Sequence, residues 1–236
     1  MRLHIIRHGD PDYTNDSLTP WGKKEAEALS LRMAELPLQT LYCSPLGRAK
    51  ETASYTEKCS GLEAKVLPWA RELHVPPVAH GDENRRSPTV IWDIPAGMLR
   101  EAEQMGDKWA EYAAFSHPET GEAVEAVRCG WETVLAECGI RRNGDLLIAE
   151  EPLPEGEMAL FCHHGLGLAL LGIILDLPVP AMWRAFWLPP SSVSTVLFER
   201  QWGNVVNPRM VCVGDTSHLY REDVTGNTSG LIYNVK

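Results

Sequence analysis

The sequence predicts a three-layer α/β protein with a mostly parallel central sheet and a partly helical insertion. Two observations carry this prediction. Short apolar, strand-like runs alternate with helical patterns over residues 1–67, and a later apolar run at 158–162 leads directly into an apolar helical segment. Strands that alternate with helices form parallel sheets, because each connection crosses back over a face of the sheet.

The first strand and the first helix are predicted from apolar spacing and from the residues at their ends. Residues 3–6 form a short apolar run that ends at Arg7-His8-Gly9, which indicates a buried strand followed by a turn. After a loop at 9–18, Thr19-Pro20 supplies an N-cap and a proline at the first helical position. Helical spacing then continues to Pro37 through the apolar residues Ala26, Leu29, Met33 and Leu36.

The same pattern repeats once. Residues 40–43 predict a second strand, and Ser44-Pro45 predicts the start of a second helix that runs to about Lys58. Residues 63–67 predict a third strand. The order strand, helix, strand, helix, strand therefore covers the first quarter of the chain.

Residues 74–155 interrupt this order, and we interpret them as an insertion within a single domain that spans 1–236. Its first part, 74–97, is rich in proline and charge. Two amphipathic helices are then predicted, with apolar stripes at Met98, Ala102, Met105, Trp109 and Tyr112, and at Val124, Val127, Trp131, Val134 and Cys138. The insertion, with Trp92, Asp93, Arg85 and Arg86, either helps to form a cap over a site or is only structural.

The last third of the chain returns to the α/β pattern. Residues 158–162 predict a strand, followed by His163-His164-Gly165 and an apolar helix to Asp176. Residues 193–198 and 210–213 predict two final strands. Residues 140–155 and the tail after Tyr220 give no clear pattern.

Composition excludes several classes of function. Lysine and arginine number 22 against 32 aspartate and glutamate, so the formal net charge is −10. Such a surface repels nucleic acid and anionic lipid, and we expect neither as a partner.

The longest apolar stretch, 166–175, is too short to span a bilayer. The chain starts on a strand-like run without a charged-then-apolar leader, and its six cysteines are scattered, so we expect a cytoplasmic protein.

Two predicted strands end in similar motifs, Arg7-His8-Gly9 and His163-His164-Gly165. Ligands bind at the carboxyl ends of strands in open parallel sheets, so histidines from distant parts of the chain can meet in one crevice. The glycine that follows each motif's last histidine permits a sharp turn and a close backbone approach to a ligand.

Two further charged residues adjoin the same edge of the predicted sheet. Arg48 lies in the first turn of the second helix, where free N–H groups and the helix dipole favour anions, and its guanidinium matches phosphate oxygens. Glu72 follows the third strand. Taken singly, each such residue is more often structural than catalytic. Their common placement at strand ends is what favours a site.

Several motifs occur in a fixed order along the chain. They are Arg7-His8-Gly9, Leu18-Thr19-Pro20-Trp21-Gly22, Ser44-Pro45-Leu46-Gly47-Arg48-Ala49, Phe161-Cys162-His163-His164-Gly165 and Val213-Gly214-Asp215-Thr216-Ser217-His218-Leu219. In this combination the chain resembles the histidine phosphatase superfamily with the phosphoglycerate mutase-like fold. The resemblance covers nearly the whole chain except the insertion.

The resemblance implies a role for five residues. His8 would attack phosphorus and become phosphohistidine, while Arg7, Arg48 and His164 would hold the phosphoryl oxygens. Glu72 would protonate the leaving oxygen. The physical logic agrees, because neighbouring arginines disfavour a proton on His8 and stabilise charge on the transferred group. These cationic groups take the place of a metal, so we expect neither metal nor cofactor.

The chain also departs from the family pattern. His163 stands where the family often has a small residue, and we assign it no role. The loop at 10–15 differs from the longer loop of mutase-type members, so Asn15 is left unassigned. The acid-phosphatase and phytase branch carries an aspartate beside the second histidine. Here Gly165 follows His164, which leaves Glu72 as the expected acid.

We therefore predict hydrolysis of a small phosphorylated substrate, a phosphomonoester, through a phosphohistidine on His8. The nearest alternative is a phosphoglycerate mutase, in which a second substrate hydroxyl replaces water; a non-catalytic module that binds a phosphorylated ligand is a further one. A metal hydrolase built from His4, His8, His163 and His164 is disfavoured, because positions 4 and 8 lie about 13 Å apart along a strand. The leaving group and the oligomeric state stay open.

Overall fold

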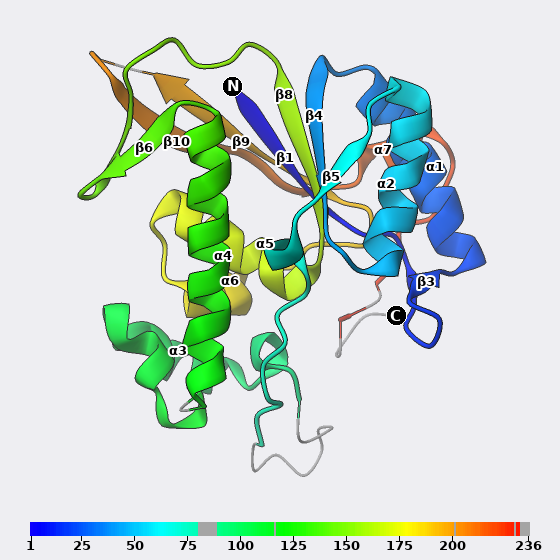
Figure 1. Ribbon diagram of the computed structural model, residues 1–236. Helices are drawn as coiled ribbons and strands as arrows, with labels where there is room; N and C mark the ends of the chain where they lie inside the picture. The colour runs from blue at the N-terminus through cyan, green and yellow to red at the C-terminus, as the bar shows by residue number, and fades with distance from the viewer. Residues whose placement is uncertain (80–88, 116, 201, 229, 232–236) are drawn as a thin grey trace.

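A computed structural model describes residues 1–79, 89–115, 117–200, 202–228 and 230–231 (Figure 1). The described residues form a central sheet of eight strands flanked by helices, which confirms the predicted α/β class. The strand order across the sheet is β5 (Ala64–Val66), β4 (Leu38–Cys43), β8 (Glu157–Cys162), β1 (Arg2–Arg7), β9 (Val193–Arg200), β10 (Val205–Asp215), β7 (Leu146–Ala149) and β6 (Ile140–Asn143).

The sheet is mixed. The predicted parallel arrangement holds for β5, β4, β8 and β1, whereas β9, β10, β7 and β6 continue the sheet with antiparallel pairs. The reason lies in the connections. A parallel neighbour needs a crossover of a dozen or more residues, and β9 is joined to β10 by a short turn, as β6 is to β7.

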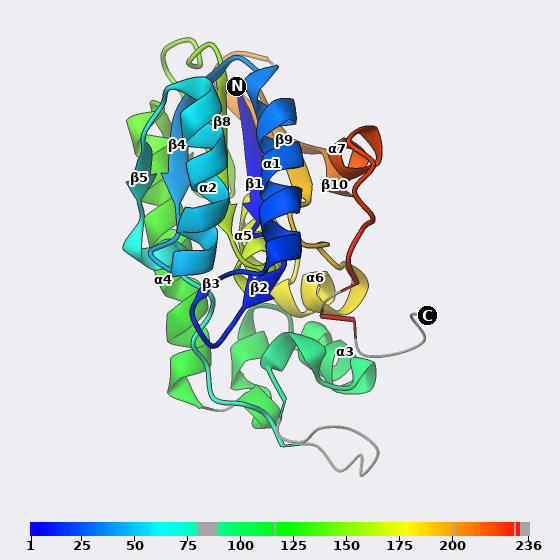
Figure 2. The ribbon, with the colours of Figure 1, turned by 90° about the vertical axis from the view of Figure 1, so that its right-hand side faces the viewer.

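Helices cover both faces of the sheet (Figures 1 and 2). One face carries α1 (Pro20–Ala34) and α2 (Gly47–Ser60), which lie side by side in Figure 2, and α7 (Ser217–Arg221) packs against α1. The opposite face carries α4 (Pro118–Glu137), α5 (His164–Leu175) and α6 (Val179–Ala185). A small hairpin of β2 (Pro11–Asp12) and β3 (Ser17–Leu18) follows β1.

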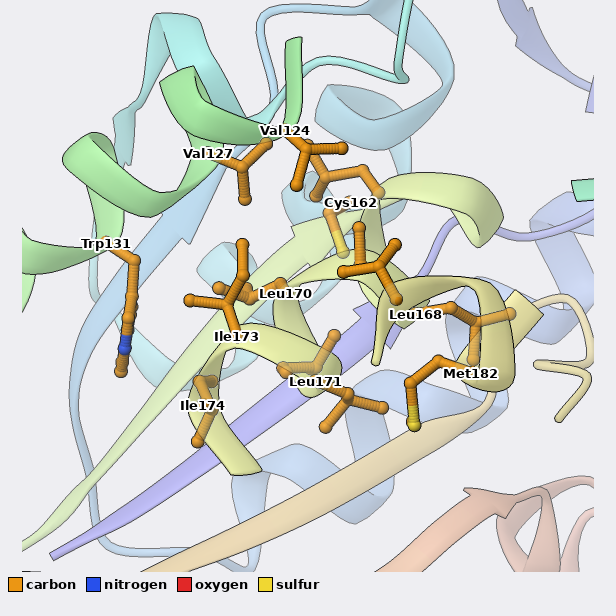
Figure 3. Packing of buried hydrophobic residues seen from close by; sticks show 14 of the residues in the cluster. Val124, Val127, Trp131, Cys162, Leu168, Leu170, Leu171, Ile173, Ile174 and Met182 are labelled. Carbon is orange, nitrogen blue, oxygen red and sulfur yellow. The ribbon is translucent and has the colours of Figure 1, made fainter. Parts of the chain in front are cut away.

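Alternation along β1 divides the core into two clusters. Leu3 and Ile5 join the cluster under α4 and α5, whereas Ile6 joins the cluster under α1 and α2. The uniformly apolar sequence of α5 is explained by its position, since residues 165–174 are all buried between the sheet and α4. Figure 3 shows this packing, in which Val124, Val127 and Trp131 of α4 lie around Leu170, Ile173 and their neighbours on α5.

Two predicted helix boundaries were wrong. The second helix begins at Gly47 after an N-cap at Leu46, and not at Ser44-Pro45. Ser44 is fully buried at the end of β4, where its N–H donates to Phe161 O (2.9 Å) and its hydroxyl contacts His163. The helix predicted over 98–112 is α3 (Ala96–Gln104) followed by a 3-10 segment, Gly106–Glu111. Gly106 adopts φ +57°, a left-handed conformation that ends the α-helix.

Residues 74–155 contribute to two parts of the molecule. In Figure 1, α3 lies beyond the carboxyl ends of β1 and β8, whereas α4 packs on α5 and the β6–β7 hairpin extends the main sheet. The short strands β6 and β7 and the helices α6 and α7 were absent from the sequence prediction. Arg85 and Arg86, the two arginines that we placed in a cap, lie outside the described residues.

Candidate active site

Two histidines meet at the carboxyl ends of β1 and β8. These strands pair in parallel with Arg7 opposite Cys162, so the residues that follow, His8 and His163, are neighbours. The His8 N–H donates to Cys162 O at 3.0 Å, and the two imidazole centroids lie 5.1 Å apart. Both histidines are buried, with exposed fractions of 2% and 0%. The predicted meeting of the two motifs is therefore observed.

The hydrogen bonds of His8 define its tautomer. Its Nδ1 lies 2.7 Å from Gly9 O, and a carbonyl oxygen can only accept, so Nδ1 carries the proton. Nε2 is then the unprotonated nitrogen, and it accepts from Nε of Arg48 at 3.3 Å. Burial, together with the charges of Arg7 and Arg48, lowers the pKa of His8 well below its usual range. The site thus holds a neutral imidazole whose unprotonated Nε2 faces the Arg48 guanidinium.

Two arginines bring positive charge to this lone pair. Arg7 is 3% exposed, and its Nη1 donates to Leu188 O at 2.6 Å. Arg48 comes from the first turn of α2 and is held by Asp16, whose Oδ1 accepts from Nη1 at 2.6 Å. The second oxygen of Asp16 accepts from the Gly47 N–H at 2.7 Å. Asp16 therefore fixes both the guanidinium and the start of α2.

His164 is the first residue of α5, and its ring has a defined orientation. The Leu188 N–H donates to Nδ1 at 3.4 Å, so Nδ1 is an acceptor and the proton of the neutral ring lies on Nε2. Burial and the neighbouring Arg7 lower the pKa of His164 to about 3. A neutral His164 offers Nε2–H as a donor, which suits a phosphoryl oxygen without adding a charge.

Glu72 reaches the same place from the segment that follows β5. Its Oε1 accepts from the N–H groups of Leu73 (3.1 Å) and Leu166 (2.8 Å), and its Oε2 accepts from the Gly165 N–H (3.2 Å). Burial raises the pKa of Glu72, although these backbone donors and Arg7 oppose the rise. Oε2 accepts only one backbone hydrogen bond, so it has room to carry a proton. It is therefore the oxygen suited to donate that proton.

One cavity of about 440 Å³ collects these side chains. All five residues that the sequence pointed to, Arg7, His8, Arg48, Glu72 and His164, line it. Trp92 and Asp93, assigned to a cap, line it as well. Asn15 is not among the residues that line the cavity; it lies in the exposed loop, where its amide donates to Asp12 (2.7 Å).

Sequence reasoning missed three contributors. Tyr13 lines the cavity, with the Arg48 guanidinium carbon 5.4 Å from its ring centroid. Asp16 holds Arg48, as described above. His163 packs on His8 while its Nε2 contacts the Ser44 hydroxyl at 2.7 Å. The only signals were the Asp-rich loop and the doubled histidine, neither of which specifies a partner.

The metal alternative receives no geometric support from the described residues. His4 lies toward the other end of β1, where Nδ1 contacts Thr195 Oγ1 (2.9 Å) and Nε2 contacts Glu157 Oε2 (2.7 Å). In the part of the chain that the structure describes, no three His, Cys, Asp or Glu side chains are grouped to hold a metal ion. Nor is any helix there both long and apolar enough to cross a membrane.

Comparison with known proteins agrees with this arrangement. Residues 3–209 match the histidine phosphatase superfamily, branch 1, and the chain belongs to this family. A probable phosphoglycerate mutase of Photorhabdus laumondii is 25% identical over 229 residues, which cover 93% of this chain and 95% of that protein.

Solved structures with other activities share the fold. A mycobacterial glucosyl-3-phosphoglycerate phosphatase matches with a TM-score of 0.63 and 21% identity, covering 90% of this chain and 98% of that chain. A phosphoserine phosphatase variant from Entamoeba histolytica, in complex with phosphoserine, matches with a TM-score of 0.61 and 16% identity, covering 92% and 98%. The chain thus shares its fold with solved phosphatases and is similar in sequence to a probable mutase.

Proposed function

We propose that the protein is a phosphatase that hydrolyses small phosphomonoesters through a phosphohistidine on His8. The observation that carries the proposal is the unprotonated Nε2 of His8, in a cavity lined also by two arginines and a neutral histidine donor. An anionic phosphoryl group is the ligand that this combination suits, because guanidinium groups pair with its oxygens and imidazole nitrogen can attack phosphorus.

The reaction then has two balanced steps. In the first, Nε2 forms a bond to phosphorus while the bond from phosphorus to the ester oxygen breaks, and Glu72 gives its proton to the leaving alcohol. Arg7, Arg48 and His164 hold the three phosphoryl oxygens. In the second, the oxygen of a water molecule forms a bond to phosphorus while the bond from phosphorus to Nε2 breaks, and the water gives a proton to the Glu72 carboxylate. Inorganic phosphate leaves, and His8 and Glu72 return to their starting states.

The second candidate is a phosphoglycerate mutase, which the likeness to the Photorhabdus protein favours. The two activities share the first step and differ in whether water or a second substrate hydroxyl accepts the phosphoryl group. An assay of 3-phosphoglycerate isomerisation with bisphosphoglycerate present separates them from each other.

Trapping the intermediate tests the proposal. A phosphoramidate on His8 is labile to acid and stable to alkali, so an acid-free quench during turnover of a labelled ester should leave label on the protein, at His8 by peptide mapping. His8→Ala should abolish labelling and turnover with an unchanged far-UV spectrum. His164→Ala should weaken substrate binding and still permit slow labelling. Label on a cysteine or on His164, or normal turnover by His8→Ala, contradicts the proposal.

A further inference from the structure

The cavity must receive the alcohol part of a substrate as well as the phosphoryl group. Arg7, His8, Arg48 and His164 line its phosphoryl end. The rest of the lining is largely apolar and includes Leu73, Val75, Pro77, Val90 and Trp92. Its other polar side chains include His74 and Asp93, and Asp93 is an acidic side chain at the end of the short 3-10 segment Ile91–Asp93.

Besides the residues of the phosphoryl end, this lining holds the carboxyl groups of Glu72 and Asp93 and the imidazole of His74. Among the described residues that line the cavity, Arg7 and Arg48 are the arginines and there is no lysine. Both arginines are committed to the phosphoryl end. A carboxylate on the alcohol part of a substrate would therefore meet Asp93 without a further arginine or lysine from the described wall. Burial raises the pKa of Asp93 to about 6, and Glu72 adds to that rise while Arg7 opposes it. At neutral pH Asp93 is largely ionised.

A second hollow of about 230 Å³ shares part of its lining with this cavity. Trp92, Asp93 and His164 line both hollows, and Trp187 joins them in the second. The indole Nε1 of Trp187 is buried and has no hydrogen-bond partner among the described residues. An alcohol part that reaches this hollow meets a carboxylate acceptor, an indole donor and aromatic surfaces, together with Arg184, whose guanidinium is paired with Glu103 (2.9 Å).

We infer that the site takes phosphomonoesters whose alcohol part carries hydroxyl or ammonium groups, which donate to Asp93, and disfavours esters that carry a carboxylate there. This inference rests on the proposed phosphatase function and specifies its substrate class. A half-buried carboxylate favours a hydrogen-bond donor, and like charges at close range are repelled.

Glycerol 3-phosphate and 3-phosphoglycerate are the matched probes, because they differ only in a terminal hydroxymethyl group against a carboxylate. The wild-type protein should show a kcat/KM for glycerol 3-phosphate about tenfold or more above that for 3-phosphoglycerate. O-Phosphoethanolamine, with an ammonium group, should also be favoured over 3-phosphoglycerate. Asp93→Asn should reduce the ratio of the first two values to near one, since the amide keeps the shape and removes the charge.

Asp107→Asn is the control, because Asp107 is exposed, lies in the same region of the chain and does not line either hollow. It should leave the ratio at its wild-type value. A preference for 3-phosphoglycerate, or an unchanged ratio in Asp93→Asn, overturns the inference while hydrolysis and His8 labelling still support the phosphatase. Failure of the wild-type protein to hydrolyse any ester or to label His8 rejects the phosphatase proposal, and this inference with it.

Discussion

The ring of His8 is held on two sides by groups that do not touch a substrate. Gly9 O fixes the Nδ1 proton, and the buried ring of His163 packs at a tilt of 59° against the imidazole. The Ser44 hydroxyl in turn contacts Nε2 of His163. Burial, with the neighbouring His8 ring and the charges of Arg48 and Arg7, lowers the pKa of His163 well below its usual range, so it adds bulk without adding charge. His163 is thus a positioning residue beside the nucleophile.

Glu72 is the residue whose role is tested most directly by changing the substrate. Glu72→Gln keeps the shape and the acceptor oxygen but removes the acidic proton. Esters with poor leaving groups should lose about 10²–10⁴-fold in kcat, because their oxygen needs a proton as it departs. An aryl phosphate with a good leaving group should lose much less. The measurement is kcat across a series of esters ordered by leaving-group pKa.

An equal loss across that series would remove Glu72 from the role of acid. Asp93, which lines the same cavity and whose pKa burial raises to about 6, is then the carboxyl group to examine. Asp10 and Asp12 are weaker candidates. Asp10 accepts from the Thr19 hydroxyl (2.7 Å) and Asp12 accepts from Asn15, and neither lines the cavity.

The residues that the sequence could indicate are those that follow strand ends or belong to ordered motifs. Four site residues satisfy at least one of these conditions, and all four line the cavity: His8, Arg48, Glu72 and His164. Asp16 and Tyr13 come from a loop with no periodic pattern. Their contacts with Arg48 depend on how the β2–β3 hairpin folds back over α2, which no local pattern specifies.

At the scale of elements, the first turn of α5 connects the phosphate site with the segment around Trp92. Gly165 donates its N–H to Glu72, and its carbonyl oxygen accepts from Nε1 of Trp183 at 3.0 Å. A Cβ added at Gly165 would lie 2.4 Å from Cε3 of Trp92. The glycine therefore permits the indole to lie directly on the helix start, next to His164.

Gly165→Ala should destabilise the protein by about 1–3 kcal/mol and reduce turnover, because the indole must move off the helix or the helix must shift. Trp92→Ala should relieve that contact, so the double variant should be less destabilised than the sum of the two single changes. Urea unfolding and kcat/KM for two esters of different size provide the measurements.

Gly97→Ala in α3 is the matched control, since a Cβ there meets no atom within 4 Å. It should be neutral or slightly stabilising, as alanine favours the helix over glycine. If the changes in free energy of unfolding of Gly165→Ala and Trp92→Ala simply add in the double variant, the two residues are not energetically coupled. Equal losses on every ester in Trp92→Ala would indicate that Trp92 is only structural.

At the scale of the whole molecule, the sequence predicts the structure most accurately where helices connect the strands. The apolar runs at β1, β4 and β8 are buried and flanked by capped or apolar helices, so pattern and structure agree. The β6–β7 hairpin was not predicted because each strand has only four residues and β6 contains Arg141 and Arg142. Its partial burial comes from pairing with β10, a long-range contact that has no local signal.

A buried carboxyl group links the stability of the whole fold to pH. Glu25 on α1 is 0% exposed, and its Oε2 accepts from the Asp10 N–H at 2.6 Å, directly behind the loop that follows His8. Its Oε1 has no hydrogen-bond partner among the described residues. Burial raises the pKa of Glu25 to about 7; the Asp10 N–H and Arg7 oppose the rise, and the Asp10 carboxylate adds to it.

The sign of the effect follows from proton binding. Between about pH 4.5 and 7 the folded protein keeps the Glu25 proton while the unfolded chain has lost it, so this group makes stability fall as pH rises through that window. The full difference is about 3 kcal/mol, from roughly 1.4 kcal/mol per pKa unit. Glu25→Gln cannot ionise and keeps an oxygen for the Asp10 N–H. Urea unfolding should therefore show the variant gaining on the wild-type protein as pH rises from 5 to 8.

Glu27→Gln, an exposed change on the same helix, is the control and should follow the wild-type curve at every pH. The comparison isolates Glu25, because each variant removes one carboxyl group from the same helix and Asp10 and Arg7 are the same in all three proteins. Parallel stability curves for Glu25→Gln and the wild-type protein between pH 5 and 8 would mean that Glu25 is already ionised in the fold. In that case Arg7, which faces both Glu25 and the phosphate site, would be stabilising its charge.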